Sequence, residues 1–221
     1  YIIHNPIENI KSFIEEKKID VNFAEGFMLR YSSLYNRLDI VILLISHGAN
    51  ISIAKGRALK LATENGNTDI VEYLIENGAI SKFYDNLKLD ILRSNENGTL
   101  HEMVEAMNKL DQYPPHKFYI NKYKDCNDRW SSIRKQITNK LEYYNTYISN
   151  LLIVSAKNGH LSILKCFVKY FKNKGTFDNY KTNFLSEALN NASINGHKEI
   201  VEYLIDIGVN IKIYDTILIN I

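Results

Sequence analysis

The apolar residues of this chain recur with the period of a helix, most clearly in residues 64–79, ENGNTDIVEYLIENGA. Four apolar side chains stand here at spacings i, i+1, i+4 and i+5, which places them on one stripe of an α-helix. The residues of this stripe are Ile70, Val71, Leu74 and Ile75. Asp69 falls in the first turn and Gly78 just after the end, which fits the helix dipole and a left-handed C-terminal stop. The pattern therefore predicts one amphipathic helix.

The same pattern is written a second time in residues 194–209, INGHKEIVEYLIDIGV, which match residues 64–79 at nine of sixteen positions. A further apolar helix ends at Gly48, 30 residues before Gly78, and this spacing sets the repeat period. Self-similarity at such a period is typical of solenoids, in which one helix pair cannot bury its apolar stripe without neighbours. The repeated stripe therefore indicates stacking of units and not catalysis.

A shorter helix is predicted before each amphipathic one, because Ala58, Leu59, Leu61 and Ala62 also follow helical spacing and include small residues that allow close approach. The two helices meet at an Asn-Gly pair, and such pairs begin at positions 65, 77, 97, 158 and 195. Asn-Gly usually signals a β-hairpin. Here the flanking residues lack period-2 alternation, so each pair is interpreted as a helix-ending turn. We expect an all-α fold with strands minor or absent.

The register can be extended along the chain by aligning each unit on the glycine of its inter-helix turn. Residues 6–22 supply only one helix, and residues 90–108 form a degraded copy. The predicted organisation is a single array with a partial unit at 1–22, units at 23–50, 51–80, 81–111, 149–175 and 182–211, a partial unit at 212–221, and an insertion at 112–148.

Residues 48–79, GANISIAKGRALKLATENGNTDIVEYLIENGA, resemble an ankyrin repeat. They match the family pattern A-L-x-x-A-x-x-N-G-H, an I-V-x-x-L-L-like helix and a final G-A-D/N. The family's Thr-Pro-Leu-His start is absent, since Arg57, Ala58, Leu59 and Lys60 occupy its places, and the period of 30 is shorter than the usual ~33. The missing residues fall in the β-turn between Gly48 and Leu59.

This resemblance implies an ankyrin-repeat solenoid that binds a partner protein on a concave face of loops and inner helices. Short units in a chain rich in Ile, Asn, Lys and Tyr look like the ankyrin arrays of large DNA viruses, which implies a host protein as partner and the host cytoplasm as location. The resemblance covers nearly the whole chain except about 112–148.

Composition agrees with a folded protein that acts inside a cell. The chain has 221 residues, of which 45% are hydrophobic and 24% charged, with a net charge of +2. The charge gives no general argument for binding nucleic acid or a membrane, and no apolar run approaches the ~18 to 20 residues that span a bilayer. Cys126 and Cys166 show no disulfide or metal-ligand spacing, which favours a reducing, intracellular compartment.

Catalytic and cofactor-binding motifs are absent from the sequence, so we expect no enzyme, no cofactor and no metal site. There is no phosphate-binding glycine loop, no HExxH and no Ser/His/Asp order. His160 and His197 each follow the glycine of an inter-helix turn, where two imidazoles could suggest a metal. Their separation by 37 residues in successive units favours structural turn residues instead.

Residues 112–148 depart from the repeat and are both basic and aromatic. Basic residues interleaved with aromatics can follow a nucleic-acid backbone and stack bases, so nucleic-acid binding is an alternative function, although a less favoured one. A stripe at three- and four-residue spacing instead predicts a long amphipathic helix that docks on the fourth unit. The residues of this stripe are Trp130, Ile133, Ile137, Leu141, Tyr144 and Ile148. Structural insertion is the favoured interpretation, with protein recognition also open.

The expected binding face includes two loops and the ends of inner helices. Phe83 and Tyr84 are the favoured anchors, because aromatic side chains contribute much of the binding energy at interfaces; packing against the fourth unit is an equal alternative. The full set of candidate residues is Ile53, Lys55 and Arg57 in one loop, Phe83, Tyr84 and Asp85 in the next, and Glu64, Lys157 and Ile194 near inner-helix ends.

The C-terminal residues remain apolar to Ile221, whereas a terminal repeat normally has a polar outer face. Leu218 and Ile219 would begin another inner helix, and the first residue of the chain is Tyr1. We expect the natural protein to continue with more repeats. We also expect this chain to self-associate through an uncapped C-terminal unit.

Overall fold

The computed structural model describes residues 4–82, 128–175 and 177–209, and it describes side chains for all of these except 128–142 and 178–183. In these ranges the regular elements are helices, as the all-α prediction requires. Their bounds are α1 Ile7–Lys17, α2 Phe23–Leu34, α3 Leu38–Ser46, α4 Ile53–Glu64, α5 Thr68–Glu76, α9 Asp128–Lys157, α10 Leu161–Asn173, α11 Phe177–Ile194 and α12 Lys198–Asp206.

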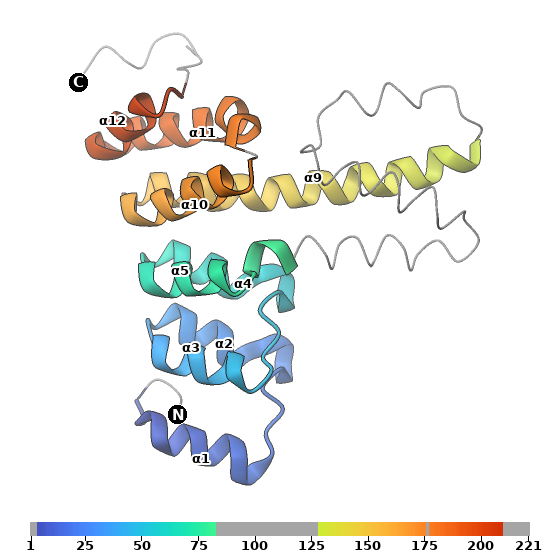
Figure 1. Cartoon of the computed structure of the whole chain (residues 1–221), viewed down its shortest axis with the longest axis vertical. Coiled ribbons are helices and arrows are strands. Elements are labelled where there is room, and N and C mark those ends of the chain that lie inside the picture. Colours follow the sequence, from blue (N-terminus) through green and yellow to red (C-terminus); the bar gives the residue numbers. More distant parts are fainter. Residues whose placement is uncertain (1–3, 83–127, 176, 210–221) are drawn as a thin grey trace.

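The helices form two rows that run along a stack of antiparallel pairs (Figure 1). In the inner row α2 packs on α4, α4 on α9 and α9 on α11. In the outer row α1 packs on α3, α3 on α5 and α5 on α10. Each pair also closes on itself, as α4 does with α5 and α11 with α12. The architecture is therefore a helical solenoid.

The apolar stripes predicted from the sequence face the interior of this stack. Ile70, Val71 and Leu74 of α5 are fully buried, and Ile200 and Leu204 occupy the same places in α12. The inner helices contribute small buried residues, among them Ser32, Ser33, Ala58, Ala62, Ser155, Ala156, Ala188 and Ala192. Side chains of this size let neighbouring inner helices approach closely, so the aliphatic residues of the outer row can fill the space between layers.

The Asn-Gly pairs end helices, as the sequence predicted. Gly66 has a φ of +75° between α4 and α5, and Gly196 has a φ of +72° between α11 and α12. Asn36 takes the same place between α2 and α3 with a φ of +56°, a conformation that Asn tolerates better than most residues. The Asn-Gly pair at 97 lies outside the described residues.

A left-handed turn opens both α2 and α4. Three consecutive residues have left-handed φ and ψ values at the start of each helix, ending at Gly26 in α2 and at Gly56 in α4. The Gly56 N–H donates to the Ser52 carbonyl oxygen over 3.2 Å. Each non-glycine residue in this conformation costs about 1–2 kcal/mol. The left-handed turn of α4, which lies where the shortened β-turn was expected, therefore has a conformational cost. Contacts from the next layer compensate for this cost.

The long helix expected in residues 112–148 is present over its C-terminal part, since α9 runs without interruption from Asp128 to Lys157. It passes through the expected end of the insertion at 148 and also forms the inner helix of the 149–175 unit. It packs on α4, the inner helix of the 51–80 unit. The 81–111 unit, on which we expected the helix to dock, lies outside the described residues. The partial unit at 212–221 also lies outside them.

Candidate protein-interaction face

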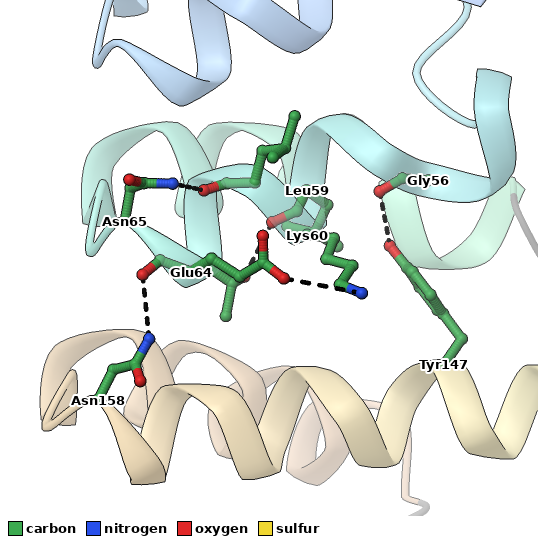
Figure 2. Close-up of polar contacts among 9 residues, drawn as sticks. Gly56, Leu59, Lys60, Glu64, Asn65, Tyr147 and Asn158 are labelled. Carbon is green, nitrogen blue, oxygen red and sulfur yellow. Dashed lines mark hydrogen bonds and ion pairs between the residues drawn. The ribbon is translucent and has the colours of Figure 1, made fainter.

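The junction between α4 and α9 joins units that are distant in sequence. Tyr147 rises from α9 toward the left-handed turn of α4 (Figure 2), and its hydroxyl donates to the Gly56 carbonyl oxygen over 3.0 Å. Burial raises the pKa of this hydroxyl above its ordinary value, so the hydroxyl stays protonated and can donate. A Cβ on Gly56 would lie only 2.4 Å from the hydroxyl oxygen. The absence of a side chain at Gly56 thus makes room for Tyr147.

The preceding junction uses an aliphatic residue in the same way. Ile53 of α4 lies against Gly26 of α2, where an added Cβ would be 2.4 Å from the Ile53 Cγ2 atom. Ile53 was predicted to bind a partner; it is half-buried and packs between layers, and its binding role stays a prediction. Each left-handed turn is thus covered by a side chain from the next inner helix, which offsets its conformational cost.

The residue after the left-handed residue of each inter-helix turn, which is Gly66 or Asn36 in the first two cases, reaches back to the preceding unit. Asn67 Nδ2 donates to the Ser33 and Leu34 carbonyl oxygens over 2.7 and 3.1 Å, and Arg37 Nη2 donates to the Asn5 carbonyl oxygen over 3.1 Å. These residues precede α5 and α3, yet neither side chain caps its helix. The side chains instead link successive layers. We call this set, with the two histidines below, the turn row.

His160 and His197 continue the turn row and act as the structural residues expected from the sequence. His160 Nε2 lies 3.4 Å from the Glu64 carbonyl oxygen, and His197 Nε2 lies 2.7 Å from the Lys157 carbonyl oxygen. Because a carbonyl only accepts, the contacts assign the proton to Nε2. The His160 ring also covers Gly66, where an added Cβ would lie 2.8 Å from the ring. The histidines are therefore contacts between layers.

The three candidate residues near inner-helix ends share one register, and their environments differ. Glu64 is half-buried, and its carboxylate lies 3.7 Å from Lys60 Nζ. Its carbonyl oxygen accepts a bond of 3.1 Å from Asn158 Nδ2, which is drawn in Figure 2. Lys157 and Ile194 are exposed. Lys157 and Ile194 can therefore contact a partner directly, while the Glu64 carbonyl oxygen is bonded to the next layer.

In the first candidate loop, Lys55 and Arg57 are exposed. Lys55 Nζ lies 5.2 Å from the centre of the Tyr143 ring on α9, so a cation–π contact orients it. The Arg57 side chain has no ion pair or hydrogen bond within the described part of the chain. The second candidate loop, with Phe83, Tyr84 and Asp85, lies outside the described residues, so its role stays a prediction.

Sequence reasoning missed a row of exposed aromatic residues on α2, formed by Phe27, Tyr31 and Tyr35. We call it the aromatic row. Its rings are in sequential contact, with centroid separations of 4.2 Å and 6.1 Å. The signal was present in the sequence, because the residues are spaced by four. Aligning them with Arg57, Leu61 and Asn65 of the next unit would have shown that aromatics are not part of the repeat.

No group of three or more His, Cys, Asp or Glu side chains gathers within the described ranges. Burial raises the pKa of the Cys166 thiol, which disfavours the reactive thiolate. Across the same ranges, no helix is both long and apolar enough to cross a membrane.

Stacked helix pairs linked by glycine turns and cross-layer hydrogen bonds define a helical-repeat protein. A family model described as ankyrin repeats (3 copies) matches residues 2–86 and 120–215. The chain therefore belongs to the ankyrin-repeat family, as the sequence resemblance indicated. The second match begins at residue 120, so it includes most of the segment expected to depart from the repeat. No curated protein and no solved structure matches the chain.

Proposed function

We propose that this chain is a non-catalytic scaffold that binds a partner protein on its inner face. The inner face comprises the exposed positions of α2, α4, α9 and α11, together with the turns that open α2 and α4. Ankyrin repeats are generally protein–protein interaction modules and are typically not catalytic. Function in such folds depends on the particular surface and not on the fold alone.

One observation carries the proposal: the residues that stack the layers recur from unit to unit, whereas an exposed register of the inner helices does not. The register that contains Arg57 holds a different residue type in every described inner helix, and all are exposed. These residues are Phe27 in α2, Arg57 in α4, Asn150 in α9 and Glu187 in α11. Stacking does not require this variety. The residue types in this register can therefore serve contact with a binding partner.

The candidate residues that support the proposal are those with free side chains on this face. Arg57, Lys157 and Ile194 are exposed and make no ion pair or hydrogen bond through their side chains within the described part of the chain. Charged and apolar groups arranged in this way provide both orientation and contact area. Lys55 lies beside them and is held over Tyr143. The second loop, with Phe83 and Tyr84, remains part of the proposal from sequence alone.

Affinity capture with matched variants tests the proposal. An inner-face variant combines Arg57→Glu, Lys157→Glu and Ile194→Ser, and an outer-face control combines Ile42→Ser and Ile205→Ser, which are exposed on α3 and α12. We expect one partner protein to bind the parent chain and the outer-face control and to be lost from the inner-face variant. Equal capture by both variants would contradict an inner-face site.

The alternative of nucleic-acid binding through 112–148 is tested on the parent chain by filter binding of a single-stranded oligonucleotide at two salt concentrations. Contacts with phosphates predict an affinity that falls steeply with salt. Such binding without capture of a protein would favour the alternative.

We also propose a viral source and self-association for this chain. Short units and an Ile-, Asn-, Lys- and Tyr-rich composition support the resemblance to ankyrin arrays of large DNA viruses. A viral source would make the partner a host protein and the location the host cytoplasm. Self-association through residues 212–221 also stays a prediction, and sedimentation over a range of concentrations tests it.

A further inference from the structure

The aromatic row on α2 is the largest run of exposed aromatic side chains in the described part of the chain. Phe27, Tyr31 and Tyr35 are 42%, 37% and 49% exposed, although each belongs to a residue type that is usually more buried. Contact between successive rings holds the row in one arrangement. Ordered aromatic side chains lose little conformational entropy when a ligand binds, which makes them effective anchors.

The other units of the same chain show that stacking does not need this row. The residues equivalent to Phe27, Tyr31 and Tyr35 are Arg57, Leu61 and Asn65 in α4, Asn150, Val154 and Asn158 in α9, and Glu187, Asn191 and Asn195 in α11. In none of these helices is the register aromatic, yet the layers pack in the same way. The row is therefore a local addition to α2.

Exposed aromatic side chains that gather on one surface favour contact with another molecule. Among the described elements, α2 packs on α3 and α4, and Phe27, Tyr31 and Tyr35 stay exposed. Contiguous exposed apolar surface of this kind is typical of interaction sites.

Arg57 supplies a positive charge one layer along the stack from the row. It stands on α4 in the register of Phe27, one layer further along the stack, and α2 packs on α4. Its guanidinium is exposed and makes no ion pair or hydrogen bond with the described residues. Guanidinium groups pair with carboxylates through two parallel hydrogen bonds. The complement of this surface is thus an apolar group beside a negative charge.

We propose that the aromatic row and Arg57 bind a short segment of a partner protein that presents an apolar side chain next to a carboxylate. This inference rests on the proposed scaffold function and specifies the chemistry of its site. The aromatic rings receive the apolar side chain, and Arg57 fixes the orientation by pairing with the carboxylate. A few residues buried at the centre of a protein interface supply most of its binding free energy. The aromatic rings and Arg57 would have this role here.

A protein segment fits this surface better than a nucleic acid does. Phe27 and Tyr31 lie at a centroid separation of 4.2 Å with an interplanar angle of 32°, so each ring occupies part of its neighbour's face. Stacking of bases needs free ring faces and a basic groove that follows the backbone. Arg30 on α2 donates to the Ala24 carbonyl oxygen of its own helix over 2.8 Å, and the whole chain has a net charge of only +2.

Peptide selection on the parent chain tests the inference. The probe is a random peptide library displayed on phage, selected on the immobilised chain. The matched variant gives α2 the residues of α4 at the same register, Phe27→Arg, Tyr31→Leu and Tyr35→Asn. We expect selected peptides to combine an apolar residue with Asp or Glu. We also expect their affinity to fall by about tenfold or more in the variant, as when interface anchors are removed.

Two further variants keep the test decisive. Tyr31→Asn, which copies Asn191 of α11, repeats the measurement if the triple variant does not fold. Arg57→Glu should weaken binding, and exchange of the peptide's carboxylate residue for Lys should restore it. Ile42→Asn on the outer row is the control and should leave binding unchanged.

Three outcomes would overturn the inference. Selected peptides could bind the triple variant as tightly as the parent chain, which would place the site elsewhere and leave the scaffold function standing. No enrichment of peptides that combine apolar and acidic residues would show that the stated chemistry is wrong. Binding of a single-stranded oligonucleotide that is lost in the triple variant and falls with salt would assign the row to nucleic acid. Failure of the scaffold function itself would appear separately, as equal capture by the inner-face and outer-face variants.

Discussion

The Tyr147 hydroxyl donates a buried hydrogen bond to the Gly56 carbonyl oxygen, although the two residues are 91 positions apart in the sequence. The bond joins α9 to the left-handed turn of α4, so the 51–80 unit and the 149–175 unit are neighbours in the stack. The inner row therefore continues from α4 to α9 directly. The inner face therefore has α2 on one side of Arg57 and α9 and α11 on the other.

Replacing Tyr147 with Phe should destabilise the chain. The substitution keeps the ring that packs on Gly56 but leaves the buried Gly56 carbonyl without its partner. An unpaired buried group costs about 1–3 kcal/mol of unfolding free energy. Urea unfolding measures the loss. Tyr35→Phe is the control, because Tyr35 is exposed and its hydroxyl has no hydrogen bond within the described part of the chain. Equal stability of the two variants would show that the Gly56 bond contributes nothing.

Alanine substitutions at two glycines should separate backbone strain from steric conflict. Gly48 and Gly56 have φ values of +84° and +70°, so either substitution costs about 1 kcal/mol through the left-handed backbone. A Cβ at Gly48 meets nothing within 4 Å, whereas one at Gly56 meets Tyr147. We expect Gly56→Ala to lower the unfolding free energy more than Gly48→Ala. Similar losses would mean that Tyr147 moves aside without cost.

The turn row predicts different effects for two neighbouring asparagines. Asn67 is buried and bonds two carbonyls of the preceding unit, whereas Asn65 is exposed and bonds Leu61 of its own helix over 2.8 Å. Asn67→Ala leaves two carbonyls without these partners and should cost about 1–3 kcal/mol. Asn65→Ala should cost less. Thermal unfolding of both variants checks the order, and a larger loss for Asn65→Ala would refute the role given to the turn row.

The ion pair between Arg37 and Asp39 predicts a pH-dependent contribution to stability. Hydrogen bonds from Arg37, of 3.0 and 2.8 Å, lower the pKa of Asp39 below its ordinary value. The folded state therefore binds this proton less tightly than the unfolded state does. The stabilisation is complete above the ordinary carboxyl pKa of about 3.9 and is lost as the pH falls through the lowered value.

Asp39→Asn should accordingly lower the unfolding free energy at neutral pH by about 0.5 kcal/mol, because the pair is partly exposed. The difference from the parent chain should shrink below about pH 4. Asp69→Asn is the matched control. Asp69 occupies the position in α5 that Asp39 occupies in α3, but the residue at the Arg37 position is the uncharged Asn67. A difference that is constant from neutral pH to below pH 4 would contradict the assignment.

The sequence predicted the fold well because stacking uses short-range patterns. Ile70, Val71 and Leu74 are spaced for a helix and are buried in α5, and the turn at Gly66 follows the asparagine expected there. These features depend on residues within one unit. The candidate positions Lys55, Arg57, Lys157 and Ile194 are exposed, and their role in binding stays a prediction.

Features that depend on contacts between distant units could not be predicted in this way. Nothing in the local sequence around Tyr147 says that it lies against Gly56, because that contact requires α9 to follow α4 in the stack. The packing of Ile53 on Gly26 also depends on a contact between units, while the binding role of Ile53 stays a prediction. The left-handed turns were also missed, since their sequences resemble a shortened β-turn.

The 51–80 unit stacks directly on the 149–175 unit, and zero-length cross-linking of the unmodified chain can detect this contact. Lys169 Nζ on α10 lies 3.7 Å from the Glu72 carboxylate on α5. A carbodiimide should therefore join these residues through an amide, and Glu72→Gln should remove the product. Lys60–Glu64 and Lys198–Glu202, at 3.7 and 3.6 Å within single helices, are internal positive controls. Mass spectrometry that finds the Glu72–Lys169 product beside both controls is the predicted result; both controls without that product would contradict it.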